Sequence, residues 1–193
     1  MKISQRAKAV APSATLAVTN RANELKAQGI DIVGFGAGEP DFDTPDYIKE
    51  AAIKAMKEGK TKYTPASGIP ELRKAIAHKL QMENGLNYTH EQIVVNIGGK
   101  HSVYEAMQAV LDPGDEVLLP APYWVTYPEA AGLAGATVKV LDTDKKNDYK
   151  ITPEQLKKAI GPKSAMLILN SPSNPGGFSY TPDELREIGR AHV

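Results

Sequence analysis

Two glycines and a lysine stand where an apolar run passes into a helical pattern. Gly98, Gly99 and Lys100 follow the run QIVVNI and precede HSVYEAMQAV. Glycines let backbone N–H groups approach an anion closely, and the start of a helix favours negative charge. The segment therefore predicts a phosphate or carboxylate site, with a tight strand-to-helix turn as the alternative. The pattern G-x-x-x-x-G-K-[ST] is absent from the sequence, which excludes an ATP-binding P-loop.

Two further residues follow apolar runs that have the character of buried strands. Trp124, the single tryptophan, comes after EVLLP, and an aromatic side chain there can stack on a flat ring. Asn174 lies in SPSNPGG after AMLILN, where its amide can donate a hydrogen bond and Pro175 stiffens the backbone. The alternatives are a tryptophan of the core or an interface and an ordinary turn asparagine.

Two loops carry weaker signals. Tyr63 lies in the turn-rich stretch 61–68, where packing is the alternative to function. The segment GFGAGEPDFDTP at 34–45 begins with two glycines in G-x-G spacing, but it lacks the rest of a dinucleotide fingerprint and no helix follows at once. Its glycines, which include Gly38, indicate close approach of another group to the backbone.

Composition excludes several classes of function. The 193 residues carry no formal net charge, so nothing favours nucleic acid or an anionic membrane surface as a partner. The sequence has no cysteine, which excludes disulfides, Cys-ligated zinc and thiol nucleophiles. The four histidines lack H-x-x-x-H spacing, so no metal site is expected, and the G-x-S-x-G elbow of serine hydrolases is absent. Without a signal segment or an 18-residue apolar run, we expect a soluble, cytoplasmic protein.

Helical and strand patterns alternate along the chain. Helices are predicted in 43–59, 68–85, 98–114, 152–161 and 181–193, and strands in 92–97, 115–120, 136–142 and 165–170. The first two helices should bury apolar faces that include Ile48 and Met56, and Leu72 and Leu80. Near-continuous apolar strands separated by helices predict an α/β fold with a sheet covered on both faces. Ligands of such sheets bind at the carboxyl ends of the strands.

The order of these motifs is more specific than any one of them. AGEPDFDTP, KYTPASGIPELR, GGK before a helix, PYWVTYPE and NSPSNPGG follow one another as in class I pyridoxal-phosphate-dependent aminotransferases, and the chain resembles this family over essentially all of its length. The nearest branch is that of the bacterial aspartate aminotransferases. The resemblance implies the fold-type-I architecture, a large domain with a mostly parallel sheet plus part of a small domain. It implies domains at 1–45 (small domain, N-terminal segment) and 46–193 (first part of the large domain), and a homodimer with shared active sites.

The resemblance also implies roles for individual residues. The Gly98-Gly99-Lys100 backbone would hold the phosphate of pyridoxal 5'-phosphate, and Trp124 would stack on its pyridine ring. Asn174 would donate to the pyridine 3-oxygen, and Tyr63 would reach the cofactor phosphate of the partner subunit. The implied substrate-binding residues are Gly38, through its backbone to the substrate carboxylate, Lys100 for the distal carboxylate of aspartate or glutamate, Trp124 and Asn174.

Some parts of the family pattern are missing from the sequence. There is no Ser-Lys pair to match the Schiff-base lysine, and no SDE-x-Y-like segment with the aspartate that contacts the pyridine nitrogen. We therefore expect no catalytic residue in this chain, a truncated N-terminal portion, and no activity of this portion alone. Gly176 stands where the family usually has threonine, which predicts a looser loop.

The expected reaction of the full-length protein moves an amino group between aspartate, or a related amino acid, and 2-oxoglutarate. Its partners would be a small amino acid and a 2-oxo acid. Two alternatives share the fold: an aromatic or kynurenine aminotransferase, and a carbon–sulfur lyase that uses the same cofactor. A third lies outside enzymology, a non-catalytic truncated binding or dimerisation module.

Overall fold

The computed structural model describes residues 2–34, 36 and 38–191, and the chain forms two compact units. One unit contains Met1–Val18 and Lys100–Val193, and the other contains Thr19–Gly99. This grouping reflects contacts within the chain, and the predicted domains 1–45 and 46–193 stay a prediction. Within the part of the chain that the structure describes, no helix combines the length and apolar character needed to cross a membrane.

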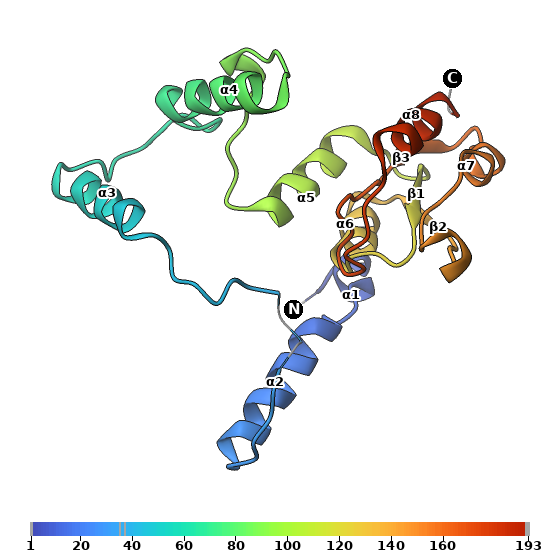
Figure 1. The fold of residues 1–193 in the computed structure, drawn as a ribbon, viewed down its shortest axis with the longest axis horizontal. Coiled ribbons are helices and arrows are strands. Elements are labelled where there is room, and N and C mark those ends of the chain that lie inside the picture. The colour runs from blue at the N-terminus through green and yellow to red at the C-terminus, as the bar shows by residue number, and fades with distance from the viewer. Residues whose placement is uncertain (1, 35, 37, 192–193) are drawn as a thin grey trace. The chain divides into compact units, whose positions relative to one another are not determined.

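A parallel sheet of three strands forms the centre of the first unit (Figure 1). Strand β1 (Glu116–Pro120) lies between β2 (Thr137–Leu141) and β3 (Ser164–Leu167), in the order β2-β1-β3. Both pairs are parallel, and Leu118 stands opposite Lys139 on one side and Leu167 on the other. The predicted α/β fold with a parallel sheet is confirmed, and the predicted ends of these three strands differ from the observed ends by no more than three residues.

Helices cover both faces of this sheet, as the apolar strands predicted. On one face, Val117 and Leu119 pack with residues of α5 (Gly99–Val110) and α6 (Thr126–Ala134). On the other face, Leu118 packs with α7 (Pro153–Ala159) and α8 (Pro182–Arg190). Successive residues of a strand point to opposite faces, so the almost complete burial of these three side chains places the core on both sides of β1. The remaining helix of this region is the short η2 (Lys145–Asn147).

The N-terminal helices are α1 (Gln5–Ala9) and α2 (Ala14–Ala27). The first lies against α6, where Arg6 donates to the Leu133 carbonyl at 3.4 Å. The backbone N–H of Ala11 donates to Glu129 at 3.1 Å. These contacts attach residues before 19 to the unit that contains the sheet.

The second unit contains α3 (Asp46–Lys57), α4 (Pro70–Asn84) and the short η1 (His90–Gln92). Their ends follow the predicted signals: Pro70 starts α4, and Gly85 ends it with φ at +66°. The prediction that these helices bury apolar faces is wrong, because neither α3 nor α4 has a buried residue. Met56 is 60% exposed and Leu72 is 42% exposed. Among the described residues, the element in closest association with α4 is η1, which is too short to cover a helix face.

The predicted strand at 92–97 is also wrong. The segment is not paired in the sheet: the N–H of Val95 donates to the Ser67 carbonyl at 3.0 Å, and Arg73 donates to the Ile93 carbonyl at 2.9 Å. A strand needs a neighbouring strand to satisfy its backbone groups, and here a turn and a side chain satisfy them instead. Gly68 allows this approach, because a β-carbon on it would lie 2.7 Å from the Val95 side chain.

An ion pair forms between α8 and the segment before α7. The ammonium of Lys150, whose side chain is 12% exposed, lies 2.6 Å from the Glu184 carboxylate. Glu184 also completes the predicted capping box, since it accepts from the Thr181 N–H at 2.7 Å while the Thr181 hydroxyl accepts from the Glu184 N–H. The hydrogen bond from Lys150 is the main cause that holds the pKa of Glu184 below its usual value, and the same bond raises the pKa of Lys150.

The substitution Glu184→Gln isolates this ion pair, because glutamine keeps the capping box and removes the charge. A carboxylate with a depressed pKa stabilises the folded state fully above the ordinary glutamate pKa of about 4.3, and this contribution disappears as the pH falls through the folded-state value. We expect the variant to unfold at lower denaturant concentration at neutral pH, with the difference vanishing in acid. Chemical unfolding from about pH 3 to about pH 8 measures this.

Glu187→Gln is the matched control on the same helix. Glu187 pairs with Arg190 at 2.7 Å, but both side chains are mostly exposed, so its loss should change stability little. Equal effects of the two substitutions, or a Glu184 effect that persists in acid, would contradict the assignment.

Candidate functional site

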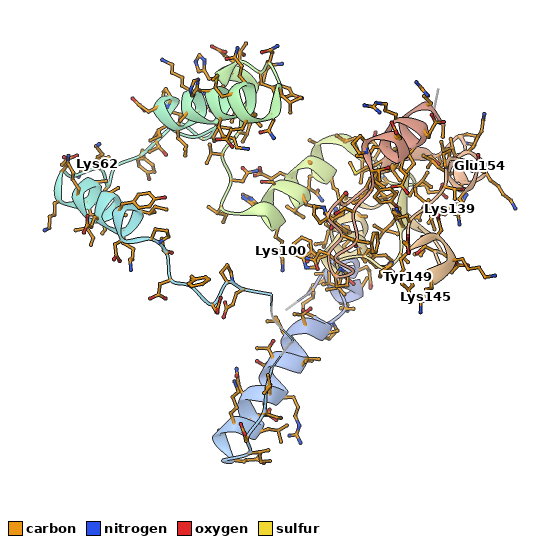
Figure 2. All side chains as sticks on the ribbon, viewed as in Figure 1. Lys62, Lys100, Lys139, Lys145, Tyr149 and Glu154 are labelled. Atoms are coloured by element: carbon orange, nitrogen blue, oxygen red, sulfur yellow. The ribbon has the colours of Figure 1, made fainter. Side chains whose placement is uncertain are left out.

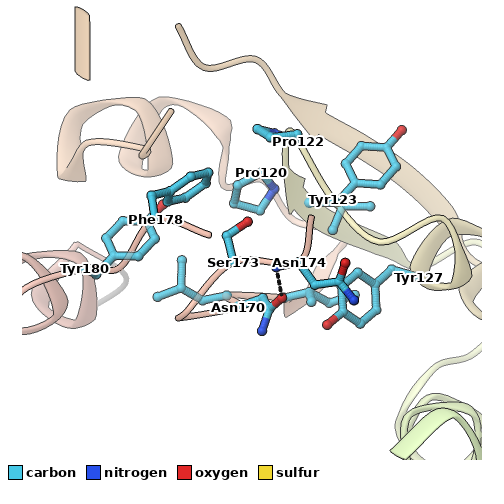
Figure 3. Close-up of a pocket in the computed structure, with 12 residues that line it drawn as sticks. Pro120, Pro122, Tyr123, Tyr127, Asn170, Ser173, Asn174, Phe178 and Tyr180 are labelled. Carbon is cyan, nitrogen blue, oxygen red and sulfur yellow. Dashed lines mark hydrogen bonds between the residues drawn. The ribbon is translucent and has the colours of Figure 1, made fainter. Parts of the chain in front are cut away.

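A small pocket lies at the carboxyl ends of β1 and β3 (Figure 3). The segment after β1 contributes Pro122, Tyr123 and Tyr127, and the segment after β3 contributes further residues. The latter are Ile168, Leu169, Asn170, Ser173, Asn174, Phe178 and Tyr180. This is the edge of a parallel sheet at which ligands bind. Asn174, a residue singled out from the sequence, is therefore part of the pocket wall.

Hydrogen bonds within the loop 170–180 define its path. The N–H of Asn174 donates to the Asn170 side chain at 2.8 Å, as the dashed line in Figure 3 marks. The N–H of Ser173 donates to the Phe178 carbonyl, and the N–H of Gly177 donates to the Ser173 carbonyl, both at 2.8 Å. Ser173 is 9% exposed. These bonds close the loop on itself and hold the backbone of Asn174 at the pocket.

Trp124 and Lys100 come together in the same unit. The Lys100 ammonium lies 5.4 Å from the centre of the Trp124 ring, within the range of a cation–π interaction. Lys100 is labelled at the first turn of α5 in Figure 2. The Trp124 ring meets Tyr127 edge to face, with ring centres 5.5 Å apart. Tyr127 thus connects Trp124 to the pocket that Asn174 lines.

Sequence reasoning did not single out Tyr127, Phe178 or Tyr180. Tyr127 is buried, and burial raises the pKa of its phenol. Tyr180 is also buried, which raises its pKa, and its hydroxyl accepts from the Ile151 N–H at 3.0 Å. The available signal was their position, since each follows a predicted strand within the same loops as Trp124 and Asn174.

The turn into α5 has the backbone that an anion site requires. Gly98 has φ at +114°, a conformation that side chains with a β-carbon rarely adopt, and Gly99 is the first residue of the helix. The first N–H groups of a helix have no partner within it and attract negative charge. A β-carbon on either glycine would meet no atom of the described residues within 4 Å. The backbone conformation therefore explains glycine at position 98, whereas no described contact or positive φ requires glycine at position 99.

The other predicted site residues belong to the unit Thr19–Gly99. Tyr63 is completely exposed, and a β-carbon on Gly38 would meet no described atom within 4 Å. Phe35 and Ala37, which belong to the same glycine-containing loop as Gly38, lie outside the described residues. The cofactor and substrate roles of all the predicted site residues stay predictions, including those of Lys100, Trp124 and Asn174.

These groups suit pyridoxal phosphate chemically. A helix start preceded by glycine matches a phosphate, a tryptophan at a strand end matches a flat aromatic ring, and an asparagine amide matches a ring oxygen. Lys100, Trp124 and Asn174 all belong to the unit with the sheet. The donor set that the structure presents therefore fits the cofactor that the resemblance implies.

Known proteins are similar to this chain over nearly all of its length. An aspartate aminotransferase of Geobacillus stearothermophilus is 51% identical over 189 residues, which are 98% of this chain and 48% of that protein. An aspartate/prephenate aminotransferase of Cereibacter sphaeroides is 54% identical over 179 residues, or 93% of this chain and 45% of that protein. The solved structure of the aspartate aminotransferase from Thermus thermophilus with maleate matches with a TM-score of 0.96 and 47% identity. The match covers all of this chain and 50% of the other.

The chain thus spans about half the length of the curated relatives that it matches. The sequence profile described as aminotransferase class I and II matches residues 30–192. The glycine turn before α5, the tryptophan after β1 and the asparagine loop after β3 all lie within these matched residues. The chain belongs to the class I and II aminotransferase family.

Proposed function

We propose that the complete protein containing this chain is a pyridoxal-phosphate-dependent aminotransferase that exchanges an amino group between aspartate and 2-oxoglutarate. Two observations together support the proposal. The chain belongs to the aminotransferase family, and its sheet has a pocket at the strand ends, lined by Asn174 on the loop after β3. Trp124 follows β1 at the same edge of the sheet.

The cofactor would be held by three kinds of contact. The backbone of Gly98, Gly99 and Lys100 would bind the phosphate, and Tyr63 of a partner subunit would reach the same group. The Trp124 ring would fix the plane of the pyridine, and its edge-to-face contact with Tyr127 restricts its rotation. Asn174 would donate to the 3-oxygen and favour its anionic form. When bound, pyridoxal phosphate supplies an electron sink for the bonds at the substrate's α-carbon.

Substrate choice would rest on the charge of Lys100. An ammonium near the second carboxylate of aspartate or glutamate forms a charge pair in a partly dry site. The Trp124 ring beside the ammonium shields it from water on one side. Gly38 would contact the α-carboxylate through its backbone. The Thermus thermophilus relative was solved with maleate, a dicarboxylate, which supports this substrate class.

A second candidate substrate is prephenate. Several relatives are named aspartate/prephenate aminotransferases, among them the Cereibacter sphaeroides protein at 54% identity and a Thermus thermophilus protein at 48%. Prephenate carries two carboxylates, as aspartate does, so one lysine could serve both. Sequence reasoning did not consider it and weighed aromatic amino acids, kynurenine and carbon–sulfur substrates instead.

The remaining proposals concern the oligomeric state, the cellular compartment and the domains of the complete protein. A homodimer with shared active sites would bring the partner's Tyr63 to the cofactor, and the cytoplasm would be the compartment. The complete protein would comprise a small domain that includes residues 1–45 and a large domain that begins at 46. The relatives' names support the enzyme over the alternative of a non-catalytic dimerisation module.

The substitution Lys100→Met in the complete protein tests the substrate proposal. We expect kcat/KM for aspartate and for prephenate to fall roughly 10- to 100-fold, the loss typical of a hydrogen bond to a charged group. Activity with phenylalanine should change little, since it has no second carboxylate. Lys157→Met, an exposed lysine on α7, is the matched control. An equal fall of kcat/KM with all three substrates would assign Lys100 to the cofactor alone. Activity of the unsubstituted protein only with cystathionine would identify a carbon–sulfur lyase instead.

The substitution Asn174→Ala in the complete protein tests the cofactor contact. We expect the affinity for pyridoxal phosphate to fall about tenfold or more. The pH at which the visible absorbance of the bound cofactor changes should rise, because the 3-oxygen loses a donor and becomes more basic. Asn84→Ala, at an exposed hydrogen bond with Lys79, is the control. An unchanged absorbance titration would remove Asn174 from this role.

Residues 1–193 expressed alone test the proposal that this portion lacks the residue that reacts with the cofactor. We expect this portion not to transaminate aspartate, because its sequence has no match to the Schiff-base lysine. After incubation with pyridoxal phosphate and exhaustive dialysis, it should keep no visible cofactor absorbance. Absorbance that survives dialysis, with turnover of aspartate, would show that a lysine of this portion does the chemistry.

A further inference from the structure

A steric conflict links two residues of the loop after β3. A β-carbon added to Gly176 would lie 2.7 Å from Cδ1 of Phe178 and closer still to Cε1, so that one of the two groups must move. Gly176 has no positive φ, so its backbone does not require glycine, whereas the next residue, Gly177, has φ at +74°. The ring of Phe178 is therefore the main steric obstacle to a side chain at position 176, and the Ser173 hydroxyl, 3.3 Å from the added β-carbon, is a lesser one.

The Phe178 ring is held in place from two sides. It stacks on Tyr149 with ring centres 6.5 Å apart, and it meets Tyr180 edge to face at 6.4 Å. Tyr149 follows η2 and has φ at +56°, an uncommon conformation for a residue with a large side chain. Tyr180 is fixed by the bond that its hydroxyl accepts from Ile151. Tyr180 is buried whereas Tyr149 is 44% exposed, so the contact with Tyr180 is the main one that keeps the ring beside position 176.

The position of Phe178 reaches Asn174 through the backbone. The carbonyl of Phe178 accepts from the N–H of Ser173, and Asn174 is the next residue in the chain. Ser173 also accepts from Gly177 through its carbonyl, which closes a tight ring of backbone bonds around Gly176. We therefore expect that a shift of Phe178 also moves the backbone of Ser173 and Asn174.

We propose that Phe178 is a positioning residue for Asn174, and that Gly176 and Phe178 form a matched pair in which the ring occupies the space of a side chain at 176. The proposal rests on the proposed function, since it assigns a role toward the cofactor. It replaces the expectation of a looser loop: where the family usually has threonine, this chain has glycine, and the adjacent space is filled by an anchored ring. A side chain at 176 becomes tolerable only when Phe178 is made smaller.

A double-mutant cycle in the complete protein tests the pair. The variants are Gly176→Ala, Phe178→Leu, Phe178→Ala and each Phe178 change combined with Gly176→Ala. The readouts are the dissociation constant of pyridoxal phosphate, the pH at which its visible absorbance changes, and the melting temperature. We expect Gly176→Ala alone to weaken the binding of pyridoxal phosphate about fivefold or more. An effect of this size corresponds to the interaction energies found between residues in contact. It should also shift the absorbance titration in the same direction as Asn174→Ala.

Combined with Phe178→Leu or Phe178→Ala, the same Gly176→Ala change should cost less than twofold, because the opposing ring is gone. Gly177→Ala is the conformational control: its β-carbon would meet no atom within 4 Å but its φ is unfavourable, so its effect should be the same with and without Phe178. Gly189→Ala on α8, also with open space, should leave cofactor binding unchanged with or without Phe178, while the melting temperature rises slightly because alanine favours a helix more than glycine does.

The outcomes separate the two proposals. Additive effects of Gly176→Ala and Phe178→Leu overturn the matched pair. Coupling in the melting temperature without any shift of the absorbance titration overturns the positioning role and leaves only packing. A parent protein that binds no pyridoxal phosphate at all overturns the proposed function, and this inference with it.

Discussion

The parallel pairing of β1 with a strand on each side is the constraint on which the site depends. Because β1 lies between β2 and β3 and all run in one direction, the segments that leave β1 and β3 emerge at one edge of the sheet. Those segments carry Trp124 and Asn174. The near-complete burial of Val117, Leu118 and Leu119 shows that both faces of this strand are covered, so β1 lies at the centre of the core of its unit.

The loop after β3 depends on a second layer of contacts that is remote from the pocket in sequence. Tyr149 and Ile151, which precede α7, hold Phe178 and Tyr180, and the Lys150–Glu184 ion pair lies directly beside them. The cation of Lys150 is also 6.0 Å from the centre of the Tyr180 ring. Aromatic packing and one partly buried ion pair thus connect the segment after η2 to the residues around Asn174. This connection explains how a loop rich in glycine and proline keeps one path.

The unit Thr19–Gly99 contrasts with this packing. Its helices α3 and α4 have amphipathic sequences, yet none of their residues is buried within the described chain. A helix gains most of its stability in proteins from burying its apolar face, so such faces need a covering surface. Tyr63, whose proposed role is toward the partner's cofactor, is fully exposed in the same unit.

The sequence by itself determined the local elements and the family. Capping boxes at Thr152 and Thr181 and the glycine that ends α4 set helix boundaries through neighbouring residues, and the ordered motifs identified class I aminotransferases before any fold was known. Only the tertiary structure decided that the apolar run 92–97 forms no strand of the sheet, that Lys100 lies over Trp124, and that Phe178 fills the space beside Gly176. The reason is that the hydrogen bonds of a helix cap join residues within one helical turn. A strand pairing, a ring contact or a steric conflict forms only when the fold of the chain brings the two groups together.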